Sequence, residues 1–329
     1  MPPTRGGPAA PPYAHLYAYS YASVDPPGRA GPLPGFREPA GHTANLKAGS
    51  AWYAILSAMT TGSTGQLQQN RPTAPARHAL SKVPEVTALF WIIKVLTTGM
   101  GETTSDYLAN QLLSPPVAVC LAGVALAAAL ALQFSVRRYV AWIYWTAIVM
   151  VSVFGTMAAD VLHVGLGVPY AASTTFFVIV LAAVLGLWYA TERTLSIHSI
   201  HTRRRELFYW ATVMTTFALG TAAGDLTAVP LHLGYFSSGV MFAVLFAVPA
   251  LGFWLLRLNA ITAFWFAYIV TRPLGASFAD WAGVPHARGG LALGTGPVSL
   301  GLAVVILVLV GYLAVSRKDV ATAPQHSAR

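Results

Sequence analysis

The chain has 329 residues, of which 55% are hydrophobic and only 9% are charged. Soluble domains carry roughly 25% charged residues, so this composition excludes an ordinary soluble domain and predicts an all-α, polytopic membrane protein. The net charge of +9 comes mainly from basic residues in the tails and in the links between apolar stretches, which argues against a nucleic-acid-binding face. Cys120 is the single cysteine, so an internal disulfide and a cysteine-based metal site are excluded.

Residues 1–80 differ from the rest of the chain. They hold 12 of the 22 prolines and show no sustained apolar period. Such a segment cannot bury enough apolar surface to form a core, so residues 1–80 are predicted to be a disordered N-terminal tail that the fold does not require.

Beyond Lys82 the chain contains eight apolar stretches. Each is close to the roughly 20 residues that an α-helix needs to cross the hydrocarbon core of a bilayer, so eight transmembrane helices are predicted. The stretches are residues 86–109, 115–135, 139–162, 169–190, 206–229, 234–256, 259–282 and 293–314.

One pattern of three residues recurs four times in the odd-numbered stretches. A Trp is followed ten residues later by a Gly and fifteen residues later by an Asp. The four sets are Trp91, Gly101 and Asp106; Trp145, Gly155 and Asp160; Trp210, Gly220 and Asp225; and Trp265, Gly275 and Asp280. The chain is therefore a fourfold internal repeat. We expect four parallel helical hairpins at residues 81–136, 137–192, 193–257 and 258–316, followed by a cytoplasmic tail at 317–329.

Basic residues indicate the orientation. They gather in the links after the second, fourth and sixth stretches and behind the last one, whereas the opposite links hold only Arg288. The residues concerned are Arg137, Arg138, Arg193, Arg203, Arg204, Arg205, Arg257, Arg317 and Lys318. By the positive-inside rule both termini are predicted to be cytoplasmic. The four Trp residues then serve as interfacial anchors near the cytoplasmic face, and the four Asp residues share one depth about 22 Å away.

Polar residues lie on the same helical face as the Asp residues. Four positions before each Asp stand Glu102, Thr156, Thr221 and Ala276. Small residues directly precede each Asp and permit close helix approach, so the carboxylates are expected to point inward and Glu102 to share a cavity with Asp106. Oxygen ligands of this kind suit hard cations or protons. The alternative is that the Asp residues hold the repeats together by hydrogen bonding.

Two basic residues lie well inside apolar stretches. Lys94 and Arg272 are expected to neutralise Glu102, Asp106 or Asp280 as buried pairs, and Arg272 alternatively to bind an anionic substrate. His163 follows Asp160 by three residues, so the two side chains can share a metal ion or relay a proton. An interfacial histidine without such a role is the other interpretation of His163.

The stretch Lys82–Asp106, together with the recurring G-x-x-x-x-D segments and the run RPLGASFAD at 272–280, resembles a bacterial family of four tandem membrane repeats. Each repeat in that family has two transmembrane segments and a Trp, and its function is not known. The resemblance covers about residues 82–315. It implies a bacterial inner-membrane protein, and it supplies neither a substrate nor catalytic residues.

These observations predict an integral membrane transporter of a cation, either a divalent metal or one coupled to protons. Its interior would be lined by Glu102, Asp106, Asp160, Asp225 and Asp280, with Thr156, Thr221 and Arg272 beside them. The alternative is a membrane scaffold or regulator in which these residues are structural. No catalytic motif is recognised, so an enzyme is not expected. The expected partners are the lipid bilayer and the cation, without nucleic acid and without a cofactor.

Overall fold

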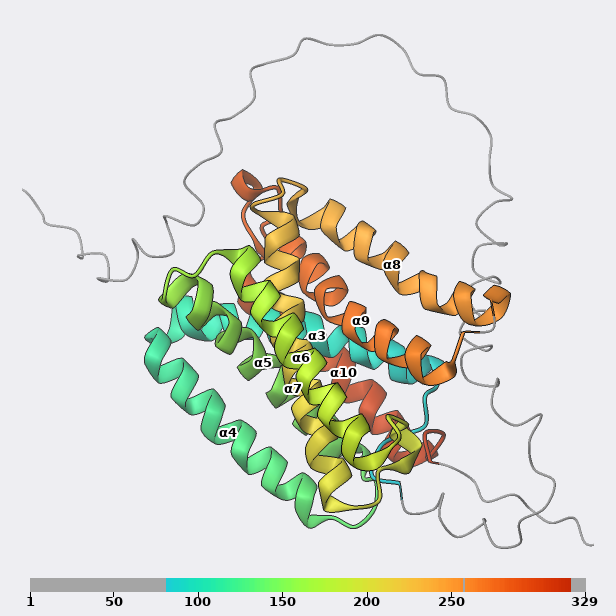
Figure 1. The fold of residues 1–329 in the computed structure, drawn as a ribbon. Helices are drawn as coiled ribbons and strands as arrows, with labels where there is room; N and C mark the ends of the chain where they lie inside the picture. Colours follow the sequence, from blue (N-terminus) through green and yellow to red (C-terminus); the bar gives the residue numbers. More distant parts are fainter. Residues whose placement is uncertain (1–80, 257, 321–329) are drawn as a thin grey trace, which may run out of the picture.

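The computed structural model describes residues 81–256 and 258–320, so the prediction for residues 1–80 lies outside it. Eight α-helices and no β-strand are found among these residues, in agreement with the predicted all-α class (Figure 1). The helices are α3 (Ala88–Tyr107), α4 (Pro115–Ser135), α5 (Ala141–Asp160), α6 (Tyr170–Glu192), α7 (Arg203–Ala228), α8 (Gly234–Leu256), α9 (Ala260–Gly283) and α10 (Thr295–Ser316).

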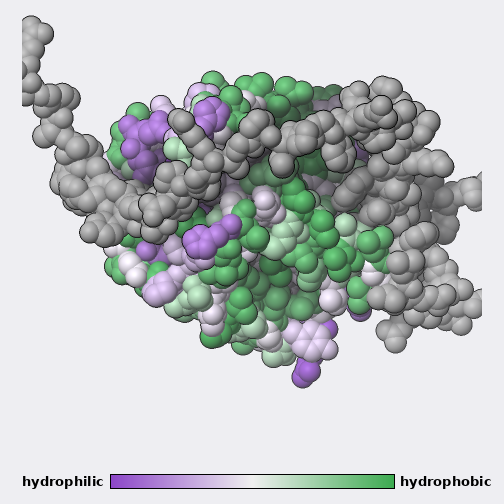
Figure 2. Space-filling model, turned by 90° about the horizontal axis from the view of Figure 1, so that it is seen from above, coloured by the Kyte–Doolittle hydropathy of each residue, from purple (hydrophilic) through white to green (hydrophobic). Residues whose placement is uncertain are grey.

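Five helical segments within the described residues are long and apolar enough to cross a membrane. They are Pro115–Ser135, Ala141–Gly165, Tyr170–Glu192, Gly234–Phe253 and Thr295–Ser316. Helices α3, α7 and α9 do not meet this measure, because they carry most of the buried charged and hydroxyl side chains. Hydrophobic residues cover much of the visible surface (Figure 2), as expected of a membrane protein.

Local sequence explains several helix ends. The side chains of Thr87, Thr202 and Asn259 accept hydrogen bonds from backbone N–H groups in the first turns of α3, α7 and α9. Helix α4 begins at Pro115, where a proline removes no helical hydrogen bond. Beyond their last α-helical turns, α3 and α5 continue as short π-helices, at Leu108–Leu112 and Val161–Gly165.

The eight helices form two concentric layers. In the inner layer α3 packs on α5, α5 on α7, α7 on α9, and α9 returns to α3, so that the inner helices close a ring. In the outer layer α4 packs on α5, α6 on α7, α8 on α9, and α10 on α3. Helices α4 and α8 accordingly lie along opposite edges of the bundle in Figure 1.

This packing corrects the prediction of helical hairpins. The second helix of each repeat makes its main contacts with the first helix of the next repeat, and α10 completes the outer layer by packing on α3. The links within a repeat therefore lead from an inner helix to an outer helix that packs on the next inner helix. Residues 161–169, for example, connect α5 to α6, which packs on α7. A hairpin and this exchanged arrangement place the same apolar residues in contact, so hydrophobic patterning does not distinguish them.

The repeated glycines allow the inner helices to approach one another. A methyl group added to any of the four would collide with a residue on the neighbouring inner helix at 2.8 Å or less. The glycine and the residue that it faces are Gly101 and Ser152, Gly155 and Phe217, Gly220 and Arg272, and Gly275 and Thr98. The last pair joins the fourth repeat to the first, so the same contact is repeated around the whole ring.

The repeated Trp residues are buried within the bundle, two of them against outer helices, which corrects their prediction as interfacial anchors. Trp91, Trp145, Trp210 and Trp265 are at most 4% exposed and pack against the aromatic residue that precedes each of them. We call these eight side chains the aromatic layer. An aromatic residue at a helix start suits either a lipid interface or an internal contact, and closure of the ring selects the internal contact.

The segments before α3 and after α10 meet at the aromatic end of the bundle. The N–H of Glu85 donates to the carbonyl of Asp319 over 2.9 Å, and Tyr139 donates a hydrogen bond to the Asp319 carboxylate. Close by in sequence, Lys82 Nζ lies 2.5 Å from Glu206 Oε2 at the start of α7. These contacts tie the first described residues to the last.

Candidate cation site

A single cavity brings together all five predicted carboxylates. Its volume is about 670 Å³, and Glu102, Asp106, Asp160, Asp225 and Asp280 all line it. The four Asp residues occupy the last turns of α3, α5, α7 and α9, at the end of the ring opposite the aromatic layer. Their convergence follows from the equal offset between Trp and Asp, because equal offsets on equivalent helices reach the same depth.

The carboxylates differ in exposure. The side chains of Asp160 and Asp225 are 24% and 20% exposed, whereas Asp280 is 7% and Glu102 is 5% exposed. Glu102 lies one helical turn further from the cavity mouth than Asp106, on the same face of α3. The cavity thus presents accessible carboxylates near its mouth and a buried one at its base.

Arg272 lies behind Glu102, outside the lining of the cavity itself. It is fully buried, and its Nη2 donates to Glu102 Oε2 over 2.5 Å and to Thr221 Oγ1 over 2.7 Å. The same nitrogen also donates to Thr156 Oγ1, while Nη1 donates to the carbonyl oxygen of Thr98 over 3.1 Å. A single guanidinium from the fourth repeat therefore bonds to each of the other three repeats.

This network bears on the two roles considered for Arg272. Its Nη donors are taken up by Glu102 and by hydroxyl and carbonyl oxygens, so the structure supports a buried ion pair with Glu102 rather than a site for an anionic substrate. Thr156 and Thr221, the hydroxyl counterparts of Glu102 in the second and third repeats, complete the network.

Lys94 does not pair with a carboxylate, contrary to expectation. Its fully buried Nζ has no hydrogen-bond partner among the described residues. Instead the ammonium lies 4.1 Å from the ring centroid of Phe217 and 4.3 Å from that of Tyr268. The electron-rich faces of the two rings attract the cation. Along α3, Lys94 lies one helical turn beyond Thr98, and Thr98 lies one turn beyond Glu102. Lys94 is therefore on the far side of Arg272 from Glu102, toward the aromatic layer.

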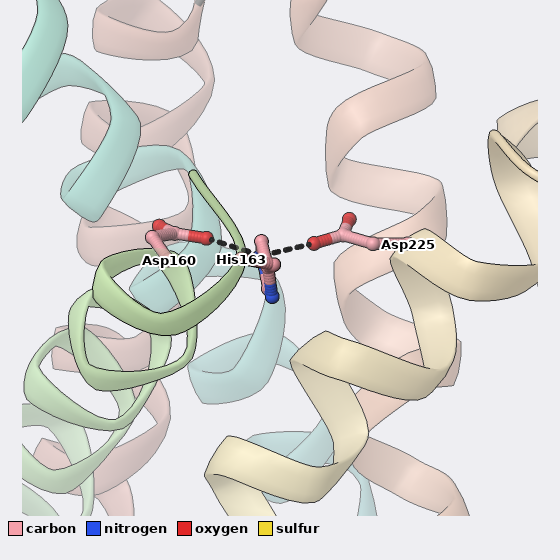
Figure 3. A group of neighbouring side chains, drawn as sticks. All are labelled: Asp160, His163 and Asp225. Carbon is pink, nitrogen blue, oxygen red and sulfur yellow. Dashed lines mark hydrogen bonds and ion pairs between the residues drawn. The ribbon is translucent and has the colours of Figure 1, made fainter. Parts of the chain in front are cut away.

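His163 lies between two carboxylates (Figure 3). Its Nε2 is 3.2 Å from Asp160 Oδ1 on α5 and 3.2 Å from Asp225 Oδ2 on α7. The imidazole is supplied by the π-helical turn after α5, and its ring centroid is 4.6 Å from that of Tyr170. The pairing with Asp160 agrees with the sequence interpretation, whereas the contact with Asp225 joins two repeats and could not be derived from spacing.

Two groups of side chains in this region have the geometry to hold a metal ion. Asp160, His163 and Asp225 form one, and Glu102, Asp225 and Asp280 form the other. The ligand atoms within each group all lie within 4.8 Å of one another. Asp225 belongs to both groups, so the two are adjacent.

Several residues of the cavity were missed from the sequence. Asn110, Gln111, Tyr170, Tyr235 and Arg288 all line it. They lie in the links or at the first turns of outer helices, just beyond the stretches that carry the Asp residues. The sequence did place these residues on the same side of the bundle as the Asp residues. It could not show that their side chains point into the cavity, because the sequence of a link does not determine the direction of its side chains.

The formal charges of the site do not balance. Five carboxylates line the cavity, with Arg272 bonded to one of them, Arg288 in the lining, and His163 against two others. When every carboxylate is ionised, negative charge remains in excess, whatever the protonation of His163. A concave, carboxylate-rich site of this kind attracts and concentrates cations.

Comparison with known families agrees with the fourfold repeat. A family model described as Repeat of Unknown Function (DUF347) matches the chain four times, at residues 89–139, 143–194, 208–258 and 263–319. Together the matches cover more than half of the chain, and each contains one inner and one outer helix. No curated protein and no solved structure matches the chain.

Proposed function

We propose that this chain, which belongs to the family of fourfold membrane repeats of unknown function, is an integral membrane transporter of cations. The observation that carries the proposal is the cavity in which Glu102 and the four repeated Asp residues meet. Carboxylates inside a membrane protein are costly and mark ion or proton pathways more often than not. The cation would enter at the Asp residues and move toward Glu102.

The arrangement of the helices supports a transport pathway along the axis of the ring. Helices α3, α7 and α9 are too polar to face lipid along their whole length, but their polar side chains point into the ring and outer helices cover them. We propose on this basis that all eight helices cross the membrane, the inner four shielded by the outer four.

A transporter must open alternately to the two sides of the membrane. The cavity is lined by residues near the Asp end and by none of the aromatic layer. Between the two lie the network of Arg272 and the ammonium of Lys94. We propose that this conformation is open toward one side only, and that passage of the ion requires the Arg272 network and the aromatic layer to rearrange.

The orientation is also a proposal. The described residues begin and end at the aromatic end, and the links at that end carry Arg137, Arg138 and Arg203. With the positive-inside rule, this favours a bacterial inner-membrane protein with both termini in the cytoplasm. Reporter fusions after Arg193 and after Lys318 should report cytoplasm, and a fusion after Gly289 should report periplasm. A periplasmic signal at Arg193 or Lys318 would reverse the orientation.

Ion flux into proteoliposomes tests the proposal directly. The full chain is reconstituted and screened with Mn²⁺, Mg²⁺, Ca²⁺, Na⁺ and H⁺. Asp106→Asn keeps the shape of the side chain but removes its charge, so it should abolish flux while thermal stability stays near that of wild type. The matched control is Glu85→Gln, which removes a carboxylate outside the cavity, at the aromatic end. It should leave flux unchanged.

The same experiment separates transport from the scaffold alternative. Structural Asp residues would show the opposite result: lower thermal stability in the Asn variants, with any flux per folded molecule unaltered. Asp160→Asn, Asp225→Asn and Asp280→Asn extend the series around the ring. Normal flux in all four single variants would overturn the transport proposal.

A further inference from the structure

We infer that the cation carried by this protein is a divalent first-row transition-metal ion, bound by Asp160, His163 and Asp225. This inference rests on the proposed transport function and narrows its substrate class. The three side chains come from α5, from the π-helical turn after it and from α7, so the group joins the second and third repeats (Figure 3).

Two of the three separations between the ligand atoms match those around a metal ion. His163 Nε2 lies 3.2 Å from one oxygen of Asp160 and 3.2 Å from one oxygen of Asp225. A divalent ion with bonds of about 2.0–2.2 Å holds neighbouring ligand atoms roughly 2.9–3.6 Å apart. The group offers carboxylate oxygens of Asp160 and Asp225 within 4.8 Å of each other, so the three side chains can close around one ion.

Hydrogen bonding alone leaves this group incompletely satisfied. A single imidazole nitrogen faces two carboxylate oxygens, and one N–H group donates well to only one acceptor at a time. The other ring nitrogen, Nδ1, is buried without a hydrogen-bond partner among the described residues. A metal ion at Nε2 would bind both carboxylates at once, and the ring proton would then move to Nδ1.

The imidazole is held in place for this task. The His163 side chain is 0% exposed, and its ring lies against Tyr170. Asp160 and Asp225, by contrast, are partly exposed and line the cavity. An ion can thus arrive from the cavity at two accessible carboxylates and then meet a nitrogen ligand that is already oriented.

The nitrogen ligand selects the class of ion. Imidazole suits Fe²⁺, Ni²⁺, Cu²⁺ and Zn²⁺ among the divalent ions, whereas Ca²⁺, Mg²⁺ and Mn²⁺ prefer oxygen ligands. The adjacent group of Glu102, Asp225 and Asp280 has oxygen ligands only, and Arg272 already bonds to Glu102. Selectivity for transition metals is therefore assigned to His163.

His163 belongs to the second repeat alone. Three residues after the repeated Asp, the other repeats have Ala109, Ala228 and Gly283. The four repeated Asp residues attract any cation. His163, which is present in one repeat only, distinguishes transition-metal ions from other cations. The selective site is thus a local departure from the symmetry of the ring.

Metal binding to the full-length protein in detergent tests the inference, with Co²⁺ as the probe because its absorption bands report the ligands. Wild type should bind Co²⁺, and Ni²⁺ or Zn²⁺ should displace it more effectively than Mg²⁺ or Ca²⁺. His163→Gln should weaken Co²⁺ binding roughly tenfold or more. The matched control is His286→Gln at the same end of the bundle, whose Nδ1 bonds to the carbonyl of Gly290. It should bind Co²⁺ as wild type does.

A second variant keeps the test decisive if His163→Gln proves unstable. His163→Cys retains a metal ligand of different chemistry, so it should bind Cd²⁺ with the ultraviolet absorption of a thiolate complex. Wild type already contains Cys120, which is exposed on α4, so the absorption is measured as the difference between variant and wild type. Absence of that difference in a folded variant would overturn the site.

Flux measurements distinguish failure of this inference from failure of transport. Zn²⁺ or Co²⁺ flux that is lost in His163→Gln and kept in His286→Gln would support it. If His163→Gln carries Mg²⁺ or Ca²⁺ and binds Co²⁺ as wild type does, the selection of transition metals is overturned, whereas the transport proposal is not. Co²⁺ binding that depends on His163 without flux of any cation would overturn the transport proposal and, with it, the assignment of the ion as cargo.

Discussion

Gly220 lies directly against the aliphatic part of Arg272: a methyl group added to the glycine would meet Arg272 Cγ at 2.3 Å and Cβ at 2.5 Å. The central guanidinium reaches Glu102, Thr156 and Thr221 from this position. Close packing of α7 on α9 and the placement of the buried charge are therefore one structural feature.

Gly220→Ala should destabilise the protein by about 1–3 kcal/mol, the usual effect of overpacking a well-packed interior. The control is Gly186→Ala on α6, where an added methyl group meets nothing within 4 Å. That change should be neutral or slightly stabilising, because alanine favours helix more than glycine does. Thermal unfolding in detergent compares the two. Equal stability of both variants would show that α7 and α9 separate more easily than their packing indicates.

Arg272→Met should destabilise the protein by about 3–5 kcal/mol, because it leaves the Glu102 carboxylate buried without its partner. Adding Glu102→Gln to the same chain should recover part of that loss, since the unpaired charge is then gone. Arg203→Met, on the exposed first turn of α7, is the control and should change stability little. If the double variant is as unstable as the sum of the two single variants, the two residues are not coupled.

Lys94→Met should raise thermal stability. The ammonium is buried without a hydrogen-bond partner among the described residues, and methionine fills a similar volume without a charge to desolvate. The opposing effect is the attraction of the Phe217 and Tyr268 rings for the cation, worth about 2 kcal/mol at a desolvated site. We expect burial to outweigh this attraction by about 1 kcal/mol or more. A lower unfolding temperature of Lys94→Met would show that the attraction of the two rings for the ammonium outweighs the cost of burying it.

Asp319 should make stability depend on pH in the acidic range. It lies beyond α10, outside the membrane-spanning segments, and burial raises its pKa despite the hydrogen bond from Tyr139. A raised pKa means that the folded state prefers the protonated carboxyl. The stabilisation is then complete below about pH 4, the ordinary value for Asp, and is lost as the pH rises through the raised pKa.

Asp319→Asn isolates this effect. The unfolding temperature of wild type relative to that of the variant should be highest at about pH 4, the ordinary pKa of Asp, and below. It should fall as the pH increases above that value. Burial also raises the pKa of Tyr139, so its hydroxyl remains a donor across the range. A difference between wild type and Asp319→Asn that grows with pH would contradict the expected sign.

Much of this architecture follows from the sequence because its signals are local. Stretches of about 20 apolar residues predicted the eight helices, and a constant offset of fifteen residues placed the four Asp residues at one end. The pairing of Arg272 with Glu102 was among the alternatives considered, since a buried guanidinium needs an anion.

What escaped prediction depends on contacts between repeats. Whether α4 packs on α3 or on α5 does not alter the apolar pattern of any helix, so the exchanged packing could not be inferred. The burial of Trp91 and its counterparts and the aromatic surroundings of Lys94 follow from that packing. The contact of His163 with Asp225 likewise joins residues of two different repeats, which lie far apart in the sequence and have no local signal in common.

The exchanged packing has a consequence for the order in which the protein is assembled. The face of α3 that meets α10 belongs to the first described helix, yet α10 is the last of the described helices to be synthesised. Until the ribosome has completed residues 295–316, the inner ring can close through α9, but that face of α3 lacks its covering helix. Completion of the outer layer therefore depends on α10, which covers the first inner helix as a late step of membrane insertion.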